Sequence, residues 1–350
     1  MSCNMRYKNK KPYKAKDDRI NDLIGQIAGN YASGFKESLM RDMLVTIAKI
    51  GEECSDPGDM KLINTTLKEF RYAFKVFSKY RHRRKVALFG SARTDKNAKE
   101  YKMAELFAKA IAKEGFQVIT GSGPGIMEAG NKGAGAVNSF GVNIRVPFEQ
   151  KPNPYIAEDT KLVNFKYFFA RKLIFIKESD ATALFPGGFG TMDEGFEVIT
   201  LFQTGKCRPR PIIMLESKGG TYWKNWLNFV KKSILKDGYI SKDELKIFSI
   251  TNDVNDAVRQ IRHFYKNYHS MRYINDITVI RLNNEMPDKV ISLIKKGFCD
   301  ILSSGPEKTP AFELETENNE HLGLPRIKMH FNRHDFGRFR ELIDVINSSY

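Results

Sequence analysis

The 350-residue sequence has few cysteines, and none of them stands at a spacing that metal or redox motifs need. The four are far apart, at Cys3, Cys54, Cys207 and Cys299, and no two form a CxxC pair. Neither a disulfide framework nor a zinc site is therefore indicated. No other cluster of His, Cys and Asp suggests a metal, and a reducing cytoplasm is the simplest compartment.

Long apolar runs are also missing. No stretch approaches the ~18 apolar residues of a membrane-spanning helix. The basic N-terminus lacks the apolar run and the small-residue cleavage site of a signal peptide. We therefore expect a cytoplasmic protein without a membrane partner. With 41% apolar residues, the chain can bury a full core and form more than one domain.

Acidic residues are absent from two segments of this chain, whose net charge is +16. Segment 1–16 has six Lys and Arg residues, and segment 71–85 has seven. Such an excess favours anionic partners, among them nucleotides and nucleic acid. A solvated tail and a solvated helix face explain the same runs, and charge runs alone are weak evidence. No RRM, KH or helix-turn-helix signature supports a nucleic-acid-binding protein.

Hydrophobic periodicity divides the chain into three predicted parts. Residues 1–80 combine the basic tail with a helical region, whose apolar residues recur at helical spacing over 18–50 and 63–77. A loop at 55–59 separates these two runs. Residues 81–267 alternate short apolar strands with helices, which predicts βαβ units on a parallel sheet. Residues 268–350 predict a small α+β module of ferredoxin-like type.

In the last two parts, an apolar period of two residues or a short apolar run predicts a strand, and a period of about 3.6 residues predicts a helix. The expected strands lie at 85–89, 116–120, 141–146, 181–185, 211–215, 277–282, 299–302, 311–314 and 326–331. The expected helices lie at 98–113, after Pro124, at 167–178, after Thr191, around 223–235, at 287–296 and at 335–347. The last helix has a broad apolar face, which must pack either on its own module or on a second subunit.

Three of the predicted strand-to-helix turns are built alike. They span residues 89–93, 120–127 and 186–191, and two of them are dense in glycine. In a parallel sheet all three lie at the carboxyl edge, where ligands bind. Glycines let backbone N–H groups approach an anion, and the following helix N-terminus adds free donors and a favourable dipole. One such turn would be explained by strand–helix packing, but three in one sheet predict a phosphate cradle.

Two fingerprints of larger nucleotides are absent. Residues 121–126 lack the sixth-position glycine of the dinucleotide motif, and Arg145 stands near the place of its ribose-binding acid. No GxxxxGK[ST] loop occurs, so an NTPase is not expected. These absences favour a smaller phosphate ester, such as a mononucleotide.

Charged residues stand close to the predicted cradle. Glu194 is expected in the first turn of the helix after 186–191, where an acid also complements the helix dipole. Arg171 and Lys172 lie in an aromatic helical run at 168–175. Such a pair could extend from an apolar surface into water, but beside a phosphate cradle these residues are candidates for chemistry.

Together these motifs resemble the LONELY GUY family. Residues 186–194 match its PGGxGTxxE motif, and Arg171 with Lys172 matches its Arg-Lys motif at the usual spacing. Residues 121–127 resemble the family's glycine-rich loop, and residues 89–91 resemble its opening turn. The resemblance covers about residues 85–250. The family comprises cytokinin-activating phosphoribohydrolases and bacterial nucleoside monophosphate nucleosidases, and it was formerly labelled lysine decarboxylase.

The resemblance implies a hydrolase that cuts the base from a nucleoside 5′-monophosphate, with Arg171 and Glu194 as the catalytic pair. It implies a Rossmann-like doubly wound sheet, no cofactor or metal, and a homodimer or larger homo-oligomer with sites near the subunit interface. The expected phosphate- and substrate-binding residues are Gly90, Ser91, Gly121, Ser122, Gly123, Gly125, Met127, Lys172, Gly187, Gly188, Gly190 and Thr191.

Two residues depart from the family pattern. Ser122 stands where the loop usually has glycine, and Phe169 stands where a histidine is frequent, which affects the expected recognition of the base. The flanking parts are similar to the longer bacterial nucleosidases rather than to the small plant enzymes, and we expect them to act in assembly or regulation. The alternative is a nucleotide-binding or sensing protein without turnover, against which the presence of both Arg171 and Glu194 argues. No feature independently indicates a pyridoxal phosphate site.

Overall fold

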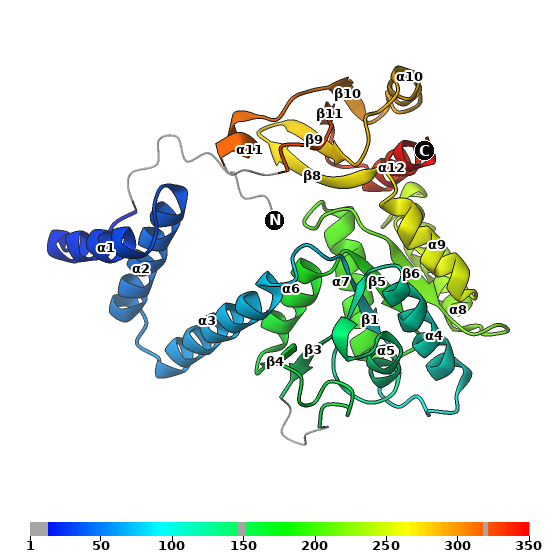
Figure 1. Ribbon diagram of the computed structural model, residues 1–350, viewed down its shortest axis with the longest axis horizontal. Coiled ribbons are helices and arrows are strands. Elements are labelled where there is room, and N and C mark those ends of the chain that lie inside the picture. The colour runs from blue at the N-terminus through cyan, green and yellow to red at the C-terminus, as the bar shows by residue number, and fades with distance from the viewer. Residues whose placement is uncertain (1–12, 146–150, 318–320, 350) are drawn as a thin grey trace. The chain divides into compact units, whose positions relative to one another are not determined.

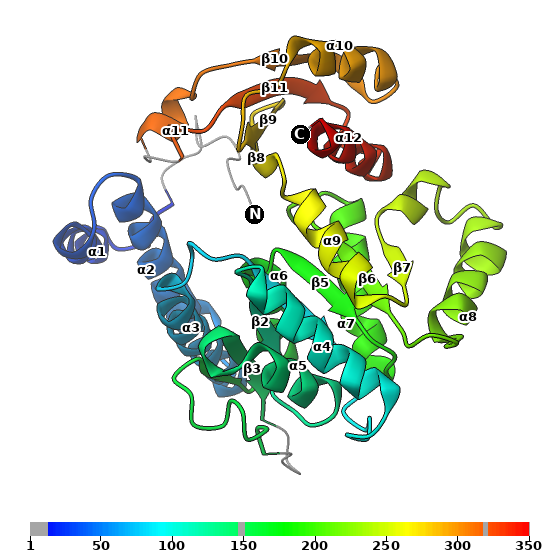
Figure 2. The same ribbon diagram turned by 45° about the vertical axis from the view of Figure 1, so that its right-hand side comes forward.

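The computed structural model describes residues 13–145, 151–317 and 321–349. The described chain forms two compact units, one up to Glu69 and one from Phe70 onward. Helix α3 (Pro57–Ser78) contributes residues to both units. Figure 1 and Figure 2 label the elements in two views.

The first unit is helical, as its apolar periodicity predicted. It contains α1 (Asp18–Tyr31), α2 (Phe35–Glu53) and the start of α3. Helix α1 begins where the Asp17 side chain accepts a hydrogen bond from the backbone N–H of Arg19, a favourable cap. The expectation of a loop over 55–59 was wrong in part, because α3 already begins at Pro57. Proline suits the first helical position, since the backbone N–H that it lacks would have no partner there.

The second unit is built on a seven-stranded sheet with the order β4-β3-β2-β1-β5-β6-β7. All neighbouring strands are parallel, which confirms the predicted Rossmann-like doubly wound fold. The sheet starts at its centre with β1 and proceeds to one edge and then to the other. Its strands are β1 (Lys85–Phe89), β2 (Gln117–Thr120), β3 (Ser139–Ile144), β4 (Leu162–Phe165), β5 (Ala181–Leu184), β6 (Ile212–Leu215) and β7 (Ser249–Thr251).

The two edge strands, β4 and β7, did not emerge from the sequence. They have four and three residues, and both include polar residues. Two residues of β4 are buried, and all three of β7 are only half-buried. An edge strand is covered less than a central one, so it lacks the continuous apolar run that identifies a buried parallel strand.

Helices cover both faces of this sheet. Helices α4 (Lys99–Lys113), α5 (Ile126–Ala134) and α9 (Val254–Phe264) share one apolar cluster with the central strands. The others are α6 (Phe168–Glu178), α7 (Phe189–Gln203) and α8 (Tyr222–Phe229), and the last continues as a π-helix over Val230–Leu235. Short 3-10 helices lie at Ala136–Asn138 and Asp243–Lys246.

The C-terminal part is an antiparallel sheet with the order β10-β11-β9-β8 and helices between the strands. This order is that of a ferredoxin-like sheet in which the last strand comes first in the chain, and the α+β prediction is confirmed. Its elements are β8 (Tyr268–Ile274), β9 (Ile277–Leu282), α10 (Asp288–Gly297), β10 (Leu302–Lys308), α11 (Glu313–Glu317), β11 (Arg326–Phe331) and α12 (Phe336–Ser348).

Two predictions for this part were wrong, and one strand was not predicted. Strand β8 was missed, the strand expected at 299–302 lies at Leu302–Lys308, and the strand expected at 311–314 is the start of helix α11. Strand β10 contains Gly305 and Pro306 and has mostly exposed residues, so its sequence has no apolar alternation.

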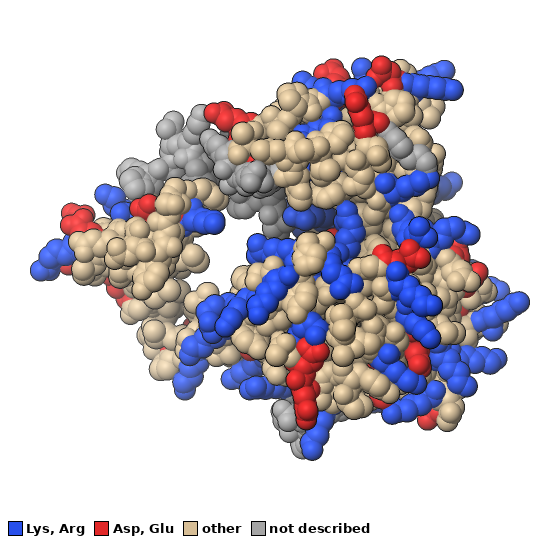
Figure 3. Space-filling view, viewed as in Figure 1, with Lys and Arg blue, Asp and Glu red and all other residues tan. Residues whose placement is uncertain are grey.

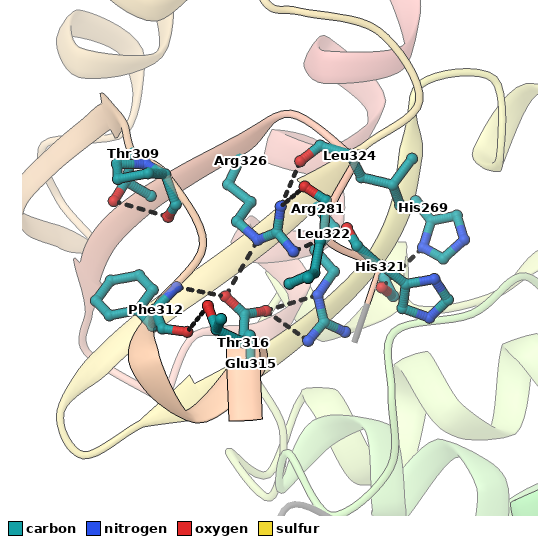
Figure 4. A network of polar contacts seen from close by, with 12 residues as sticks. His269, Arg281, Thr309, Phe312, Glu315, Thr316, His321, Leu322, Leu324 and Arg326 are labelled. Atoms are coloured by element: carbon teal, nitrogen blue, oxygen red, sulfur yellow. Dashed lines mark hydrogen bonds and ion pairs between the residues drawn. The ribbon is translucent and has the colours of Figure 1, made fainter. Parts of the chain in front are cut away.

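A buried ionic network explains why α11 takes its place in this sheet. Glu315 is fully buried, and its carboxylate pairs with Arg281 of β9 at 2.5 Å and with Arg326 of β11 at 3.1 Å (Figure 4). The backbone N–H of Phe312 also donates to Glu315. Buried charges require such partners, and the partners come from strands that are distant in sequence. A local pattern therefore could not predict α11.

The apolar face of α12 is covered within the chain. Phe336, Phe339, Leu342 and their neighbours belong to one cluster with β9, β11, α7 and α8. The rings of Phe336 and Phe202 of α7 lie 6.4 Å apart between centroids. The C-terminal sheet and the parallel sheet therefore share a core, and α12 does not need a second subunit to cover these residues.

The basic run at 71–85 is used partly inside the fold. Arg83 donates to the Gly115 carbonyl, Arg84 lies over the Tyr265 ring, and the buried Lys85 ammonium donates to the carbonyls of Tyr80 and Arg83. Figure 3 shows other Lys and Arg side chains spread over the visible face among acids. In the described ranges, no helix is long and apolar enough to cross a membrane.

Candidate active site

The three similar turns meet at the carboxyl edge of β2, β1 and β5, which are neighbours at the centre of the parallel sheet. The backbone N–H of Ser91 donates to the Pro186 carbonyl at 3.1 Å, and the N–H of Ile126 donates to the Ser91 carbonyl at 3.0 Å. The turn after β1 therefore joins the other two. This is the region between strands β1 and β5, where the direction of the connections reverses and open α/β sheets bind ligands.

Several glycines in these turns are required by packing. A Cβ at Gly90 would lie 2.6 Å from Ile126, and one at Gly187 would collide with Thr191. Gly125 has a φ of +65°, a conformation that disfavours other residues, and its Cβ would collide with the Ser91 carbonyl. These three glycines let the turns lie against one another.

Gly188 and Gly190 are different, because the protein itself leaves room beside them. A Cβ at either position would meet no atom within 4 Å, and neither glycine has a positive φ. Gly188 caps α7 without a side-chain hydrogen bond, and α5 likewise begins at Gly125 without one. Two helix N-termini thus present uncapped N–H groups at this edge, which is a favourable environment for a phosphate.

Ser122 occupies a position of left-handed backbone conformation. Its φ is +67°, which accounts for the glycine that the family usually has there. The Ser122 side chain is buried and lies against Gly141, where an added Cβ would collide with its hydroxyl. Its carbonyl accepts hydrogen bonds from the backbone N–H of Asn153 at 2.7 Å and from the Asn153 amide at 3.1 Å. The loop therefore accommodates a serine here, and the two hydrogen bonds from Asn153 hold the loop in place.

Asn153 and Tyr222 support the turns and were not found in the sequence. The Asn153 amide also donates to the Gly123 carbonyl at 3.2 Å and to the Asn131 side chain at 3.0 Å. The Tyr222 hydroxyl donates to the Gly187 carbonyl. Neither residue belongs to a glycine-rich motif, and both are at least 30 positions from the glycines whose carbonyls they contact, so no local signal indicated them.

Arg171 projects from the first turn of α6 toward the end of β2. Its Nε donates to the Val142 carbonyl at 2.9 Å. Its guanidinium lies against Gly121, where an added Cβ would collide with it, and beside it lies the sulfur of Met127. Burial lowers the pKa of Arg171 and the nearby Glu194 opposes this shift, but a guanidinium stays charged in proteins. Gly121 thus provides the space for a half-buried cation.

Glu194 is 7% exposed and lies in the second turn of α7, not in the first as expected, because the helix already begins at Phe189. The first turn contains no acid, so interaction with the helix dipole does not explain the position of Glu194. Burial raises the pKa of Glu194, while Lys172 and Arg171 act in the opposite direction. A buried carboxylate with two cations nearby is a typical candidate for acid–base chemistry.

Lys172 is surrounded by carboxylates of α7. Its Nζ lies 2.9 Å from Asp193, 3.2 Å from Glu194 and 2.7 Å from Glu197. Burial disfavours the ammonium, but these acids outweigh it and raise the pKa of Lys172. The site therefore contains two cations in different surroundings, one against a glycine and one among acids.

Phe169, which stands where the family frequently has a histidine, places an aromatic side chain next to the site. Phe169 is half exposed and stacks on Tyr167, with ring centroids 5.6 Å apart.

Within the described ranges, no group of three or more His, Cys, Asp or Glu residues could hold a metal ion.

Comparisons with known proteins give matches over part of this chain. The family model described as possible lysine decarboxylase matches residues 123–261. The cytokinin riboside 5′-monophosphate phosphoribohydrolase LOG7 of Arabidopsis thaliana is 33% identical over 94 residues, which are 27% of this chain and 42% of that protein. This chain thus matches less than half of the length of LOG7.

A longer match is the probable cytokinin riboside 5′-monophosphate phosphoribohydrolase LOGL5 of Oryza sativa subsp. japonica. It is 25% identical over 207 residues, which are 58% of this chain and 79% of that protein. Among solved structures, the molybdenum cofactor carrier protein of Chlamydomonas reinhardtii aligns over 51% of this chain and 96% of its own, with a TM-score of 0.36 and 17% identity. The sequence matches confirm the resemblance to the LONELY GUY family.

Proposed function

We propose that this chain, as a relative of the LONELY GUY phosphoribohydrolases, hydrolyses the N-glycosidic bond of a nucleoside 5′-monophosphate to free base and ribose 5-phosphate. The observation that carries the proposal is the buried Glu194 carboxylate, 3.2 Å from Lys172, at the same edge as the Arg171 guanidinium that lies against Gly121. The presence of a buried acid and a half-buried cation at this edge argues against a protein that only binds nucleotide.

The phosphate is expected at the uncapped N-termini of α5 and α7. Backbone N–H groups there are free of side-chain caps, and Gly188 and Gly190 leave open space for close approach. Binding energy from the phosphate holds the sugar in place without taking part in the bond change. The same edge then presents the ribose to Arg171 and Glu194.

In the reaction, the bond between C1′ and the base nitrogen breaks and positive charge develops on the ribose, as in other glycosyl hydrolyses. The Glu194 carboxylate stabilises this charge and takes a proton from the attacking water. The water oxygen bonds to C1′, and Arg171 relieves the negative charge of the departing base. The base then receives the proton that Glu194 took from the water, which returns Glu194 to its carboxylate form. The sum is one water consumed for one base and one ribose 5-phosphate released.

The test is incubation of the full chain with AMP, GMP, CMP, UMP and a cytokinin riboside monophosphate, followed by chromatography for free base. At least one nucleotide should be cleaved, and its nucleoside should react far more slowly because it lacks the phosphate. Tight binding of nucleotides with no cleavage would favour the alternative of a sensing protein. Equal rates on adenosine and AMP would contradict the phosphate site.

Assembly is part of the same proposal. We expect a homodimer or larger homo-oligomer in the cytoplasm, with residues 1–80 and 268–350 acting in assembly or regulation. Light scattering of the full chain measures the first expectation directly.

A further inference from the structure

We propose that Lys172 is a positioning residue, which holds the Glu194 carboxylate in place and balances its charge, and that it does not bind the substrate phosphate. The inference rests on the proposed function, because it assigns a role within the same site. It differs from the role that the family resemblance implied for this lysine.

The first argument is the number of donors. An ammonium group has three N–H bonds, and three carboxylate oxygens lie within 3.2 Å of Nζ. The lysine side chain is 16% exposed. Asp193, Glu194 and Glu197 are close together on α7, so the ammonium of α6 meets all three at once. The contact with Asp193 is a hydrogen bond, and a phosphate at Nζ would have to compete with all three carboxylates.

The second argument is the sign of the charge. Three carboxylates surround the one ammonium of Lys172, so the net charge around Nζ is negative. Arg171 is a second cation that acts on Glu194. A phosphate dianion would be repelled there. The glycine-rich turns are more favourable for it, since residues 121–125 and 187–191 contain no acid. The acid in the first turn of α5, Glu128, pairs with Lys96 at 2.7 Å.

The third argument concerns what happens without the lysine. Glu194 is buried, and Glu197 disfavours its ionised form. If Lys172 is removed, Asp193 and Glu197 remain on the same helix and Arg171 alone opposes the repulsion. Glu194 then takes up a proton at a higher pH, so that less of the carboxylate that the chemistry needs is present at any given pH.

The main test compares the pH dependence of kcat/KM for Lys172→Met and Lys172→Arg with the unmodified chain. For Lys172→Met the acidic limb should move up by about 1–3 pH units, the shift typical of losing one close opposite charge, and activity should recover at higher pH. Lys172→Arg keeps the charge and should leave the limb near its original place. Lys177→Met is the matched control from α6, since Lys177 pairs with Glu178 away from the turns, and it should change neither kcat nor KM.

If Lys172 instead binds the substrate phosphate, the Lys172→Met variant should behave differently. Its KM should be raised at every pH, with no recovery at high pH, and this result would overturn the proposal. The double variant Lys172→Met/Glu197→Gln provides a further check, because removal of one acid should return the acidic limb toward its original pH. No return would mean that charge balance is not the role of Lys172.

Two measurements keep the inference testable if turnover is not found or if Lys172→Met does not fold. Carbon-13 NMR can follow the Glu194 carboxyl, identified by the signal that Glu194→Gln removes, and its pKa should rise in Lys172→Met without any substrate. In Glu197→Gln the pKa of Glu194 should fall. An unchanged Glu194 titration in the variants that fold overturns the inference, whereas absence of nucleotide cleavage in the unmodified chain refutes only the proposed function.

Discussion

Gly190→Ala is expected to make the protein more stable and at the same time weaken its binding of nucleotide. Gly190 is the second residue of α7, it has no positive φ, and a Cβ there would meet no protein atom within 4 Å. The fold therefore gains from the substitution, because alanine reduces the conformational entropy of the unfolded chain. If a phosphate approaches this turn, the new methyl group occupies its place.

The substitution should increase the free energy of unfolding and make the free energy of nucleotide binding less favourable, and the two changes differ enough in size to be measured separately. The free energy of unfolding should rise by about 0.4–1 kcal/mol, which corresponds to a melting temperature higher by about 1–4 °C for a domain of this size. Loss of one backbone hydrogen bond to a charged phosphate is worth about 1.5–3 kcal/mol. That loss should raise KM for the best nucleotide on the order of 10- to 100-fold.

Calorimetry and steady-state kinetics on the same preparation measure both quantities. Gly51→Ala in α2 is the matched control, since this helical glycine also has no atom within 4 Å of its Cβ position. It should raise stability and leave KM unchanged. Gly187→Ala should lower stability, because its Cβ collides with Thr191. An unchanged KM in a stabilised Gly190→Ala protein would refute a phosphate site at the start of α7.

Three further predictions concern the acid, the cation and the C-terminal sheet. Glu194→Gln should reduce kcat on the order of 10²-fold or more while calorimetric nucleotide binding is retained; an active variant would leave Glu194 a structural role only. Gly121→Ala should displace the Arg171 guanidinium, with which its Cβ collides, and lower kcat in a protein whose circular dichroism is unchanged; normal kcat would show that the position of Arg171 is not critical. Glu315→Gln should destabilise the chain by about 3–5 kcal/mol in denaturant titrations, because it leaves two buried guanidiniums without their carboxylate. Burial tends to raise the pKa of Glu315, but hydrogen bonds from the Phe312 backbone and from Arg281 outweigh it and lower this pKa. The carboxylate therefore contributes stability above its ordinary pKa of 4.5, and this stability is lost as the pH falls through the lower folded value. The variant should lack this acid-dependent loss, and an equal acid sensitivity in both proteins would contradict the assignment.

The sequence alone determined those features whose signals are local. The alternation of apolar strands and amphipathic helices predicted a parallel sheet, since the two periods can be recognised within a few residues. The glycine-rich turns predicted a ligand site at one edge, because every parallel strand ends at the same side of its sheet. Arg171 and Glu194 stand within short contiguous motifs, so they could be proposed as a pair before their surroundings were known.

The tertiary structure decided what depends on residues far apart in the chain. Helix α11 forms where two arginines of other strands meet Glu315, although its own sequence suggested a strand. Asn153 fixes a turn 30 positions away. In the sequence Lys172 is only a cation next to Arg171, whereas the structure shows three carboxylates of α7 around it. Charge balance and burial depend on distances in space, and a pattern along the chain records neither.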